Sequence, residues 1–324
     1  MSERSRDGWR PTAALEALRL RAQLLERARA YFAQTGALEV ETPVLVRAAV
    51  TDLHLESLEV RRSDGTHLGF LHTSPEYAMK RLLCAGAPDV YQVAHVFREG
   101  ERGGRHNPEF TMIEWYRLGL DHRALMRDVE ALLRALLEPL RPVGPTVHVT
   151  YAQAFESVLG VDALCAATGE IETALRNAGV DVPEGLSADR DGLLDLGMAT
   201  HVTARFADDR ITFVRDFPAS QAALARVAGP VAARFEAFWG GLELANGFHE
   251  LGDASEQAQR FASDAAARRE RRQPAREADQ LFLDALAAGL PECAGVALGF
   301  DRVVMVATGA RRIDDVVAFP IERA

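Results

Sequence analysis

The stretch FREGERGGRHNPEFTMIEWYR, residues 97–117, carries the strongest fold signal in the chain. Its first half is a glycine-rich, charged loop between two strand-like segments, a form that suits wrapping a polyanion with backbone and guanidinium groups. In its second half, the two-residue period of a strand puts Phe110, Met112, Glu114 and Tyr116 on one face. Phe110 or Met112 alone would indicate plain core, but a carboxylate aligned with core residues is costly unless a cation pairs with it. This face is therefore predicted to be part of a site.

A second stretch, GGLELANGFHEL at residues 240–251, contains two carboxylates, Glu243 and Glu250. They are seven residues apart, so on a regular strand they would face opposite sides of the sheet. A bulge at Asn246–Gly247 would bring both to one side, because an extra residue reverses the alternation. Two convergent carboxylates suit a Mg²⁺ ion that is held together with ATP phosphates.

A third stretch, GVALGFDRVVMV at residues 295–306, puts Gly295 and Gly299 in a strand that leads into Asp301 and Arg302 at a helix start. Glycine lets a ligand approach the backbone closely, and Arg302 is suited to gripping a phosphate with two hydrogen bonds. The chain has no G-x-x-x-x-G-K-[ST] loop, and no G-x-G-x-x-G follows a strand. Nucleotide sites of the P-loop and Rossmann types are therefore excluded.

The remaining pattern predicts an α+β organisation. A first helix is predicted between Thr12, a candidate N-cap, and Gly36, a candidate C-terminal stop. Strand patterns cover residues 67–72, 90–97, 109–118, 210–217, 235–250 and 295–300. Helical patterns cover residues 75–84, 122–140, 152–159, 171–178, 190–206, 256–272 and 277–288. Strands in runs, with helices bunched between them, favour an antiparallel sheet, and residues 151–209 are predicted to be a mostly helical insertion between its two halves.

Composition narrows the class of protein. The formal net charge of −10 argues against a large nucleic-acid-binding surface, because affinity for phosphate comes from Lys and Arg. The sequence shows no signal-peptide pattern and no apolar run of membrane-spanning length, so we expect a cytoplasmic protein that does not bind a membrane. The three cysteines, Cys84, Cys165 and Cys293, are far apart and indicate neither a zinc site nor a disulfide framework.

Together the three stretches resemble the signature motifs of class II aminoacyl-tRNA synthetases. ALEVETPVL at residues 37–45 is similar to motif 1, residues 97–116 are similar to motif 2, and GVALGFDR at residues 295–302 is similar to motif 3. HNPEFTM and ELANGFHEL are similar to lysyl-tRNA synthetases in particular. IEWYR, GVALG and the length of the chain resemble the elongation factor P lysine ligases, a family that attaches (R)-β-lysine to a lysine of elongation factor P.

The resemblance implies one α+β class II catalytic domain over residues 1–324, with the insertion at about 151–209 and without an anticodon-binding domain. A mixed, mainly antiparallel sheet flanked by helices is expected. So is a homodimer formed through motif 1. ATP would be a substrate and Mg²⁺ a cofactor.

The same resemblance implies roles for single residues. The amino-acid substrate would contact Ser74, Glu76, Glu114, Tyr116, Asn246, Glu250 and Ala297. ATP would contact Arg98, Glu99, Gly100, Asn107, Phe110, Glu243, Leu244, Gly299 and Arg302. Within these sets Arg98 and Arg302 would be the catalytic pair, Glu243 and Glu250 the metal ligands, and Phe110 would stack on adenine. Lysyl-tRNA synthetases carry glutamate where this chain has Gly100, which leaves Glu99 and Glu101 as alternatives for that contact.

The predicted activity has two steps: ATP activates (R)-β-lysine or lysine as an adenylate, and a lysine ε-amine of elongation factor P then takes the acyl group. The first alternative is a truncated lysyl-tRNA synthetase, but the acidic balance and the missing anticodon module count against it, and we expect no tRNA partner. The second is an inactive regulatory paralogue, against which the retention of Arg98, Glu243, Glu250 and Arg302 counts.

Two further residues carry expectations. Lysyl-tRNA synthetases have glycine where this chain has Ala297, so the extra methyl predicts a preference for β-lysine over α-lysine. Lys80 is the only lysine of the chain. GC-rich codon usage is the simpler interpretation of this scarcity, and the alternative is that an enzyme making a lysine-reactive acyl donor is spared self-modification.

Overall fold

The computed structural model describes residues 8–324. These residues form two compact units, and each is described by itself. Unit 1 comprises the described residues up to Gly119 together with Gly252–Glu292 and Ala297–Ala324, and unit 2 comprises Leu120–Leu251 and Cys293–Val296. Strand β12 (Cys293–Gly299) has residues in both units.

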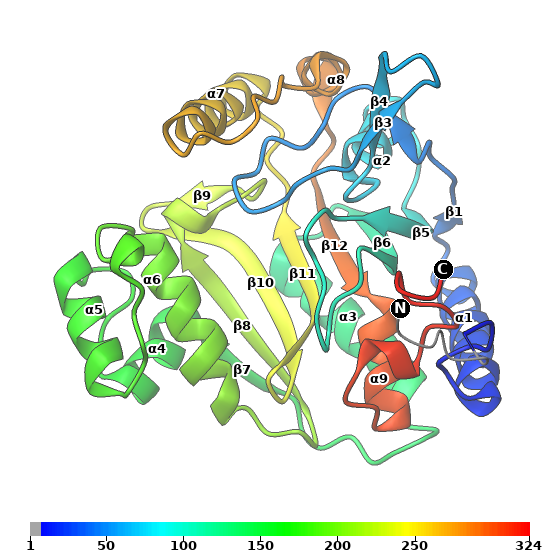
Figure 1. The fold of residues 1–324 in the computed structure, drawn as a ribbon, viewed down its shortest axis with the longest axis horizontal. Coiled ribbons are helices and arrows are strands. Elements are labelled where there is room, and N and C mark those ends of the chain that lie inside the picture. The colour runs from blue at the N-terminus through cyan, green and yellow to red at the C-terminus, as the bar shows by residue number, and fades with distance from the viewer. Residues whose placement is uncertain (1–7) are drawn as a thin grey trace, which may run out of the picture. The chain divides into compact units, whose positions relative to one another are not determined.

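Unit 1 contains two sheets and the helices that pack on them (Figure 1). Its helices are α1 (Leu15–Gln34), α2 (Glu76–Cys84), α7 (Ala254–Glu270), α8 (Gln280–Gly289) and α9 (Phe300–Thr308). Its strands are β1 (Leu38–Glu39), β2 (Leu45–Val46), β3 (Glu59–Arg61), β4 (His67–Leu71), β5 (Val90–Phe97) and β6 (Glu109–Leu118). β5 and β6 pair antiparallel and β1 pairs parallel with β5, while β2, β4 and β3 form a separate antiparallel sheet.

Helix α1 covers one face of the β5–β6 pair. Its buried residues recur at the helical spacing of Leu24, Ala28 and Phe32. The Phe32 ring stacks on Tyr91 at 4.2 Å between centroids and meets Trp115 edge-on at 5.3 Å. Tyr91 and Trp115 are directly opposite in the register and so share this face. The side chains on the other face of the pair, Glu114 among them, therefore point away from α1.

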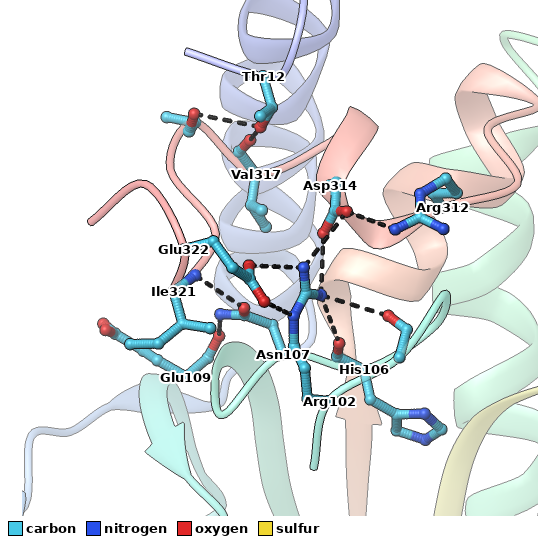
Figure 2. Close-up of polar contacts among 12 residues, drawn as sticks. Thr12, Arg102, His106, Asn107, Glu109, Arg312, Asp314, Val317, Ile321 and Glu322 are labelled. Carbon is cyan, nitrogen blue, oxygen red and sulfur yellow. Dashed lines mark hydrogen bonds and ion pairs between the residues drawn. The ribbon is translucent and has the colours of Figure 1, made fainter. Parts of the chain in front are cut away.

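The chain ends of unit 1 correct one expectation. Thr12 does not cap α1: the helix begins at Leu15 after Ala14, without a side-chain cap. The Thr12 hydroxyl instead donates to the carbonyl oxygen of Val317 at 3.1 Å (Figure 2). Its backbone N–H donates to Ala318 at 2.9 Å. A residue whose type suggests a local helix cap thus connects the chain before α1 to residues 317 and 318.

Unit 2 contains parallel and antiparallel strand pairs and its own helices. Its helices are α3 (His122–Leu137), α4 (Tyr151–Leu159), α5 (Thr168–Asn177) and α6 (Arg190–Gly197). Its strands, besides the first residues of β12, are β7 (Val147–Thr150), β8 (Ile211–Pro218), β9 (Val227–Ala228), β10 (Val231–Trp239) and β11 (Leu242–His249). β10 pairs antiparallel with β8, β9 and β11, and β7 pairs parallel with β8. With β1–β5 as the parallel pair of unit 1, the expected mixed, mainly antiparallel arrangement is confirmed.

Helices α4, α5 and α6 gather beside β8 (Figure 1) and share one core with it. That core joins Phe155, Leu175 and Leu194 from the three helices to Val214 and Phe217 of β8. These helices fall within the predicted insertion, whose boundaries stay a prediction. Helix α3 is strongly amphipathic, because Leu125, Val129, Leu132 and Leu136 recur on one buried face.

Two predicted elements differ in detail. The pattern at residues 235–250 is not one strand but the hairpin of β10 and β11, which turns at Gly240 with a φ of 53°. The predicted helix 190–206 ends as α6 at Gly197 and continues as a π-helical turn, Met198–Val202, and a 3₁₀ turn, Thr203–Arg205. Periodicity alone does not distinguish these tighter and wider turns from α-helix.

Candidate active site

A cluster of polar groups lies on the face of β6 that α1 does not cover. Glu114, which is 2% exposed, accepts hydrogen bonds from Ser74 Oγ at 2.7 Å and from the Tyr116 hydroxyl at 2.6 Å. The Glu76 backbone N–H donates to Ser74 Oγ at 2.9 Å, and Lys80 Nζ donates to Glu76 Oε1 at 2.6 Å. We call these five residues the carboxylate cluster. The structure thus brings together four predicted substrate residues, and it adds Lys80.

Charge and burial define what this cluster can bind. Burial, and then the neighbouring Glu76 carboxylate, raise the pKa of Glu114 to about 7, while its hydroxyl donors and Lys80 oppose the rise. Lys80 is fully buried one helical turn after Glu76 on α2. When both glutamates are ionised, the two carboxylates and the one ammonium carry a single net negative charge. The cluster is therefore suited to one further organic ammonium.

The motif 2 loop, residues 98–108 between β5 and β6, carries the candidate nucleotide contacts. The Arg98 guanidinium lies over the Phe110 ring at 5.1 Å from its centroid, and its Nη1 contacts Glu101 Oε1 at 3.4 Å. Arg98 Nε is buried and has no hydrogen-bond partner among the described residues. An arginine that stacks on an aromatic ring and has an N–H donor available is suited to binding an anion such as a phosphate.

The other loop positions are held by the backbone. The Glu99 N–H donates to the Glu56 carbonyl at 2.9 Å, and Gly100 turns the chain with a φ of 80°. That backbone angle favours glycine, which gives a physical reason for the departure at position 100. The Glu101 side chain contacts Arg98. Glu99 and Glu101 both stay candidates for the nucleotide contact that glutamate makes at position 100 in lysyl-tRNA synthetases.

The end of the loop meets α9. The Asn107 side chain donates to the Glu109 carbonyl at 2.7 Å and accepts from the Ile321 N–H at 3.1 Å, so it braces the loop (Figure 2). Arg302, in the first turn of α9, contacts His106 Nε2 at 2.8 Å. Gly299 stands at the N-cap of that helix. The predicted ATP residues of unit 1 are thus distributed over the motif 2 loop, β6 and the start of α9.

Motif 3 supplies two further contacts in unit 1. Ala297 packs, together with Phe110, on a small cluster that includes Val96 and Met112. The buried Asp301 accepts from the Thr111 N–H at 2.7 Å and pairs with Arg21 of α1. Asp301 therefore joins α1, β6 and α9, a role that no local sequence pattern indicates.

Three of the four predicted residues of unit 2 fall on one side of β11 and of the residue that follows it: Glu243, Asn246 and Glu250. The bulge that aligns them is at Leu244, not at Asn246–Gly247 as expected: Ala237 pairs with Ala245 but Phe238 pairs with Glu243. With that extra residue, Glu243 and Asn246 fall on the same side, and the two-residue period continues to Glu250.

Gly247 has another reason to be glycine. An added Cβ would meet the Phe235 ring at 2.5 Å and the Gly295 carbonyl oxygen at 3.0 Å. The glycine that suggested a bulge is instead a point of close packing.

The same face carries an acidic residue that sequence analysis missed. Glu236 of β10 is directly opposite Asn246 and pairs with Arg234 at 2.6 Å. Burial, together with the neighbouring Glu243 carboxylate, raises the pKa of Glu236 to about 7, and Arg234 opposes this rise. Asn246 Oδ1 is buried without a hydrogen-bond partner among the described residues. The signal available in the sequence was the spacing of Arg234 and Glu236, two apart on a strand of otherwise apolar residues.

Comparisons with known proteins place the chain in a family. The sequence profile described as "tRNA synthetases class II (D, K and N)" matches residues 1–323. The chain belongs to this family. Class II synthetase chemistry uses ATP, so membership makes the protein an ATP-using ligase. The class II fold predicted from the three motifs is therefore confirmed.

Relatives within the class II synthetase family are similar over nearly their whole length. The chain is 45% identical to the "Elongation factor P--(R)-beta-lysine ligase" of Salmonella gallinarum over 324 residues, which covers 98% of each chain. Proteins with the same name from Salmonella dublin and Salmonella paratyphi B show the same identity and coverage. Within residues 8–324, no helix is long and apolar enough to cross a membrane, and no group of three or more His, Cys, Asp or Glu side chains forms a metal site.

Proposed function

We propose that this protein activates (R)-β-lysine with ATP and transfers the β-lysyl group to a lysine ε-amine of elongation factor P. The observation that carries the proposal is the identity of 45% over 98% of the chain to ligases of that name. The carboxylate cluster supports it independently, because two glutamates with a single lysine leave one negative charge for an ammonium group of the substrate. With an acceptor of this kind, we propose the cytoplasm as the location of the protein.

The proposed first step is attack of the substrate carboxylate on the α-phosphorus of ATP, with pyrophosphate as the leaving group. Arg98 and Arg302 would neutralise the charge that develops on the phosphate oxygens. Phe110 would hold the adenine by stacking, and Asn107 would keep the loop in place. In the second step the ε-amine of the acceptor attacks the acyl carbon and AMP leaves, so no covalent nucleophile of the enzyme is required.

A divalent cation fits the acidic face of β11. The donors there are carboxylate and amide oxygens, which Mg²⁺ prefers. The Glu243 carboxylate helps to raise the pKa of Glu236, and a cation bound nearby would relieve that repulsion. We therefore propose Glu243 and Glu250, the predicted pair, as its protein ligands. Bound Mg²⁺ would supply charge neutralisation for the phosphates.

ATP–pyrophosphate exchange tests the first step. Exchange that depends on (R)-β-lysine and exceeds that with α-lysine is expected, and absence of exchange with either amino acid would favour the inactive-paralogue alternative. Transfer is measured by intact mass of elongation factor P after incubation with enzyme, ATP and (R)-β-lysine. A variant of the acceptor without the modified lysine is the matched control. Charging of tRNA without modification of the acceptor would instead support a truncated synthetase.

We also propose the homodimer that motif 1 implies. Leu38, Val44 and Leu45 are exposed apolar side chains in that segment, and exposed apolar residues gathered in one segment favour association. Analytical ultracentrifugation at micromolar concentration is expected to give the mass of two chains. A single-chain mass would refute this part of the proposal.

A further inference from the structure

The motif 2 loop is bound to the far end of the chain. We call residues 312–322 the C-terminal segment. Ile313 N–H donates to the Gly104 carbonyl at 2.8 Å, and Ile321 N–H donates to Asn107 Oδ1 at 3.1 Å. In both hydrogen bonds the donor is in the C-terminal segment and the acceptor is in the motif 2 loop, more than two hundred positions earlier in the sequence.

Arg102 is the centre of this connection, as Figure 2 shows. Its guanidinium binds the Glu322 carboxylate through Nε and through Nη2, the latter at 2.6 Å. It also binds Asp314, with Nη1 at 3.0 Å from Oδ1. Nη1 further donates to the Gly103 and His106 carbonyls of its own loop, each at 3.3 Å. One side chain therefore joins two carboxylates of the C-terminal segment to the backbone of the loop.

The charges of the connection are matched. The two carboxylates raise the pKa of Arg102 above its ordinary value, so the guanidinium stays charged. Burial alone would raise the pKa of Asp314, but hydrogen bonds from Arg102 and Arg312 hold it below its ordinary value. The Arg102 hydrogen bonds likewise lower the pKa of Glu322. All of these groups are therefore ionised at neutral pH, and the connection does not switch off in the physiological range.

The loop needs such a connection because of its composition. Gly100, Gly103 and Gly104 give it more backbone freedom than other residues would, and ordering that freedom costs free energy. The proposed ATP contacts Arg98 and Asn107 lie at its two ends. A loop fixed before ATP arrives does not have to be ordered by ATP binding, so the nucleotide binds more tightly.

We propose that Arg102, Asp314 and Glu322 form a clamp that holds the motif 2 loop in its ATP-binding form, so that the C-terminal segment sets the affinity for ATP without touching it. Arg102 is a positioning residue in this scheme. The inference rests on the proposed function only in that ATP is the ligand of the loop.

The test is steady-state ATP–pyrophosphate exchange with purified full-length variants. Arg102→Met removes the charge and the paired N–H donors of the guanidinium but keeps an aliphatic side chain. Glu322→Gln makes a milder change at a carboxylate that is 54% exposed, so the fold should be unaffected. We expect KM for ATP to rise roughly 3- to 30-fold in Arg102→Met, the usual range for a residue that acts through another. We expect a smaller rise in Glu322→Gln, little change in kcat, and no change in KM for the amino acid.

Two comparisons separate the clamp from general destabilisation. Arg61→Met removes an exposed ion pair with Glu59 on the small sheet, and it should leave KM for ATP unchanged. Arg102→Lys keeps the positive charge without the planar set of N–H donors. Its KM for ATP should therefore lie between those of wild type and Arg102→Met. Hydrogen exchange of residues 99–108 gives a readout besides activity: protection should fall in Arg102→Met and return when ATP is added.

The outcomes are distinguishable. If wild-type enzyme shows no exchange with (R)-β-lysine or lysine, the proposed function fails, and the hydrogen-exchange result with ATP alone still decides the clamp. If wild type is active and Arg102→Met keeps the wild-type KM for ATP, the clamp is refuted while the function stands. Loss of loop protection without any change in KM would also refute it, because the loop would then be held without consequence for ATP.

Discussion

The raised pKa of Glu114 predicts a pH dependence for amino-acid activation. In the proposed contact this carboxylate must be ionised to bind the substrate ammonium, and its pKa in the free protein is about 7. Because kcat/KM reports ionisations of the free enzyme, kcat/KM for (R)-β-lysine should fall about tenfold from pH 8 to pH 6. The measurement is pyrophosphate exchange at saturating ATP and Mg²⁺. Because the pKa of Glu236 is also about 7, a variant of Glu114 is needed to assign the profile to Glu114.

The variant Glu114→Gln isolates this group. It keeps a side chain of the same shape beside Ser74 and Tyr116 but removes the charge. Losing one charged partner of a buried contact costs about 2 to 5 kcal/mol, so kcat/KM should fall at least 30-fold at pH 8, and the loss toward pH 6 should disappear. Glu109→Gln, at a half-exposed position on the same strand, is the matched control and should keep the wild-type profile.

The sign for stability is the opposite of that for activity. The folded-state pKa of about 7 lies above the ordinary value of 4.5, so the folded protein holds this proton more tightly than the unfolded chain does. The contribution of Glu114 to stability therefore declines as pH rises between these values, by about 3 kcal/mol in all. Glu114→Gln should remove this decline from urea-unfolding curves. A flat wild-type activity profile, or one that persists unchanged in Glu114→Gln, would refute the assignment of Glu114 to substrate binding.

Three further changes test other parts of the site and fold. Glu250→Gln should abolish pyrophosphate exchange while circular dichroism stays native, and near-normal exchange would remove Glu250 from the site. Ala297→Gly should shift the kcat/KM ratio from β-lysine towards α-lysine by roughly 10- to 200-fold, and an unchanged ratio would mean that the methyl is not the selector. Gly247→Ala should destabilise the fold by about 1 to 3 kcal/mol in urea, because its Cβ would meet the Phe235 ring at 2.5 Å. Gly169→Ala, where a Cβ meets nothing within 4 Å, is its control and should not destabilise.

Alternation along β6 predicted correctly which of its side chains share a face. Glu114 and Tyr116 share the face that the two-residue period assigns to them, and they contact each other directly. In a strand that is paired along its whole length, the register fixes the face on which each side chain lies. The glycine-rich loop and the helix start at Arg302 were also readable from the sequence, since both depend on local backbone chemistry.

The features that the sequence did not predict have a common physical cause, which is contact between distant parts of the chain. Thr12 suits a helix cap by composition, yet its hydroxyl binds a carbonyl 305 residues away. Asp301 and Arg102 likewise take their partners from remote segments. The bulge at Leu244 depends on how two strands come into register, and no single-strand pattern contains that information.

The burial of Lys80 has a practical meaning for chemistry on the protein surface. It is the only lysine in the sequence, and its amine is enclosed and engaged with Glu76. Reagents that acylate ε-amines consequently find no exposed lysine on the folded enzyme, so in a mixture with an acceptor protein the label reports on the acceptor. The same holds for any activated aminoacyl group that escapes into solution. A mass increase on the enzyme itself would then mark its terminal amine or a molecule that has opened around α2.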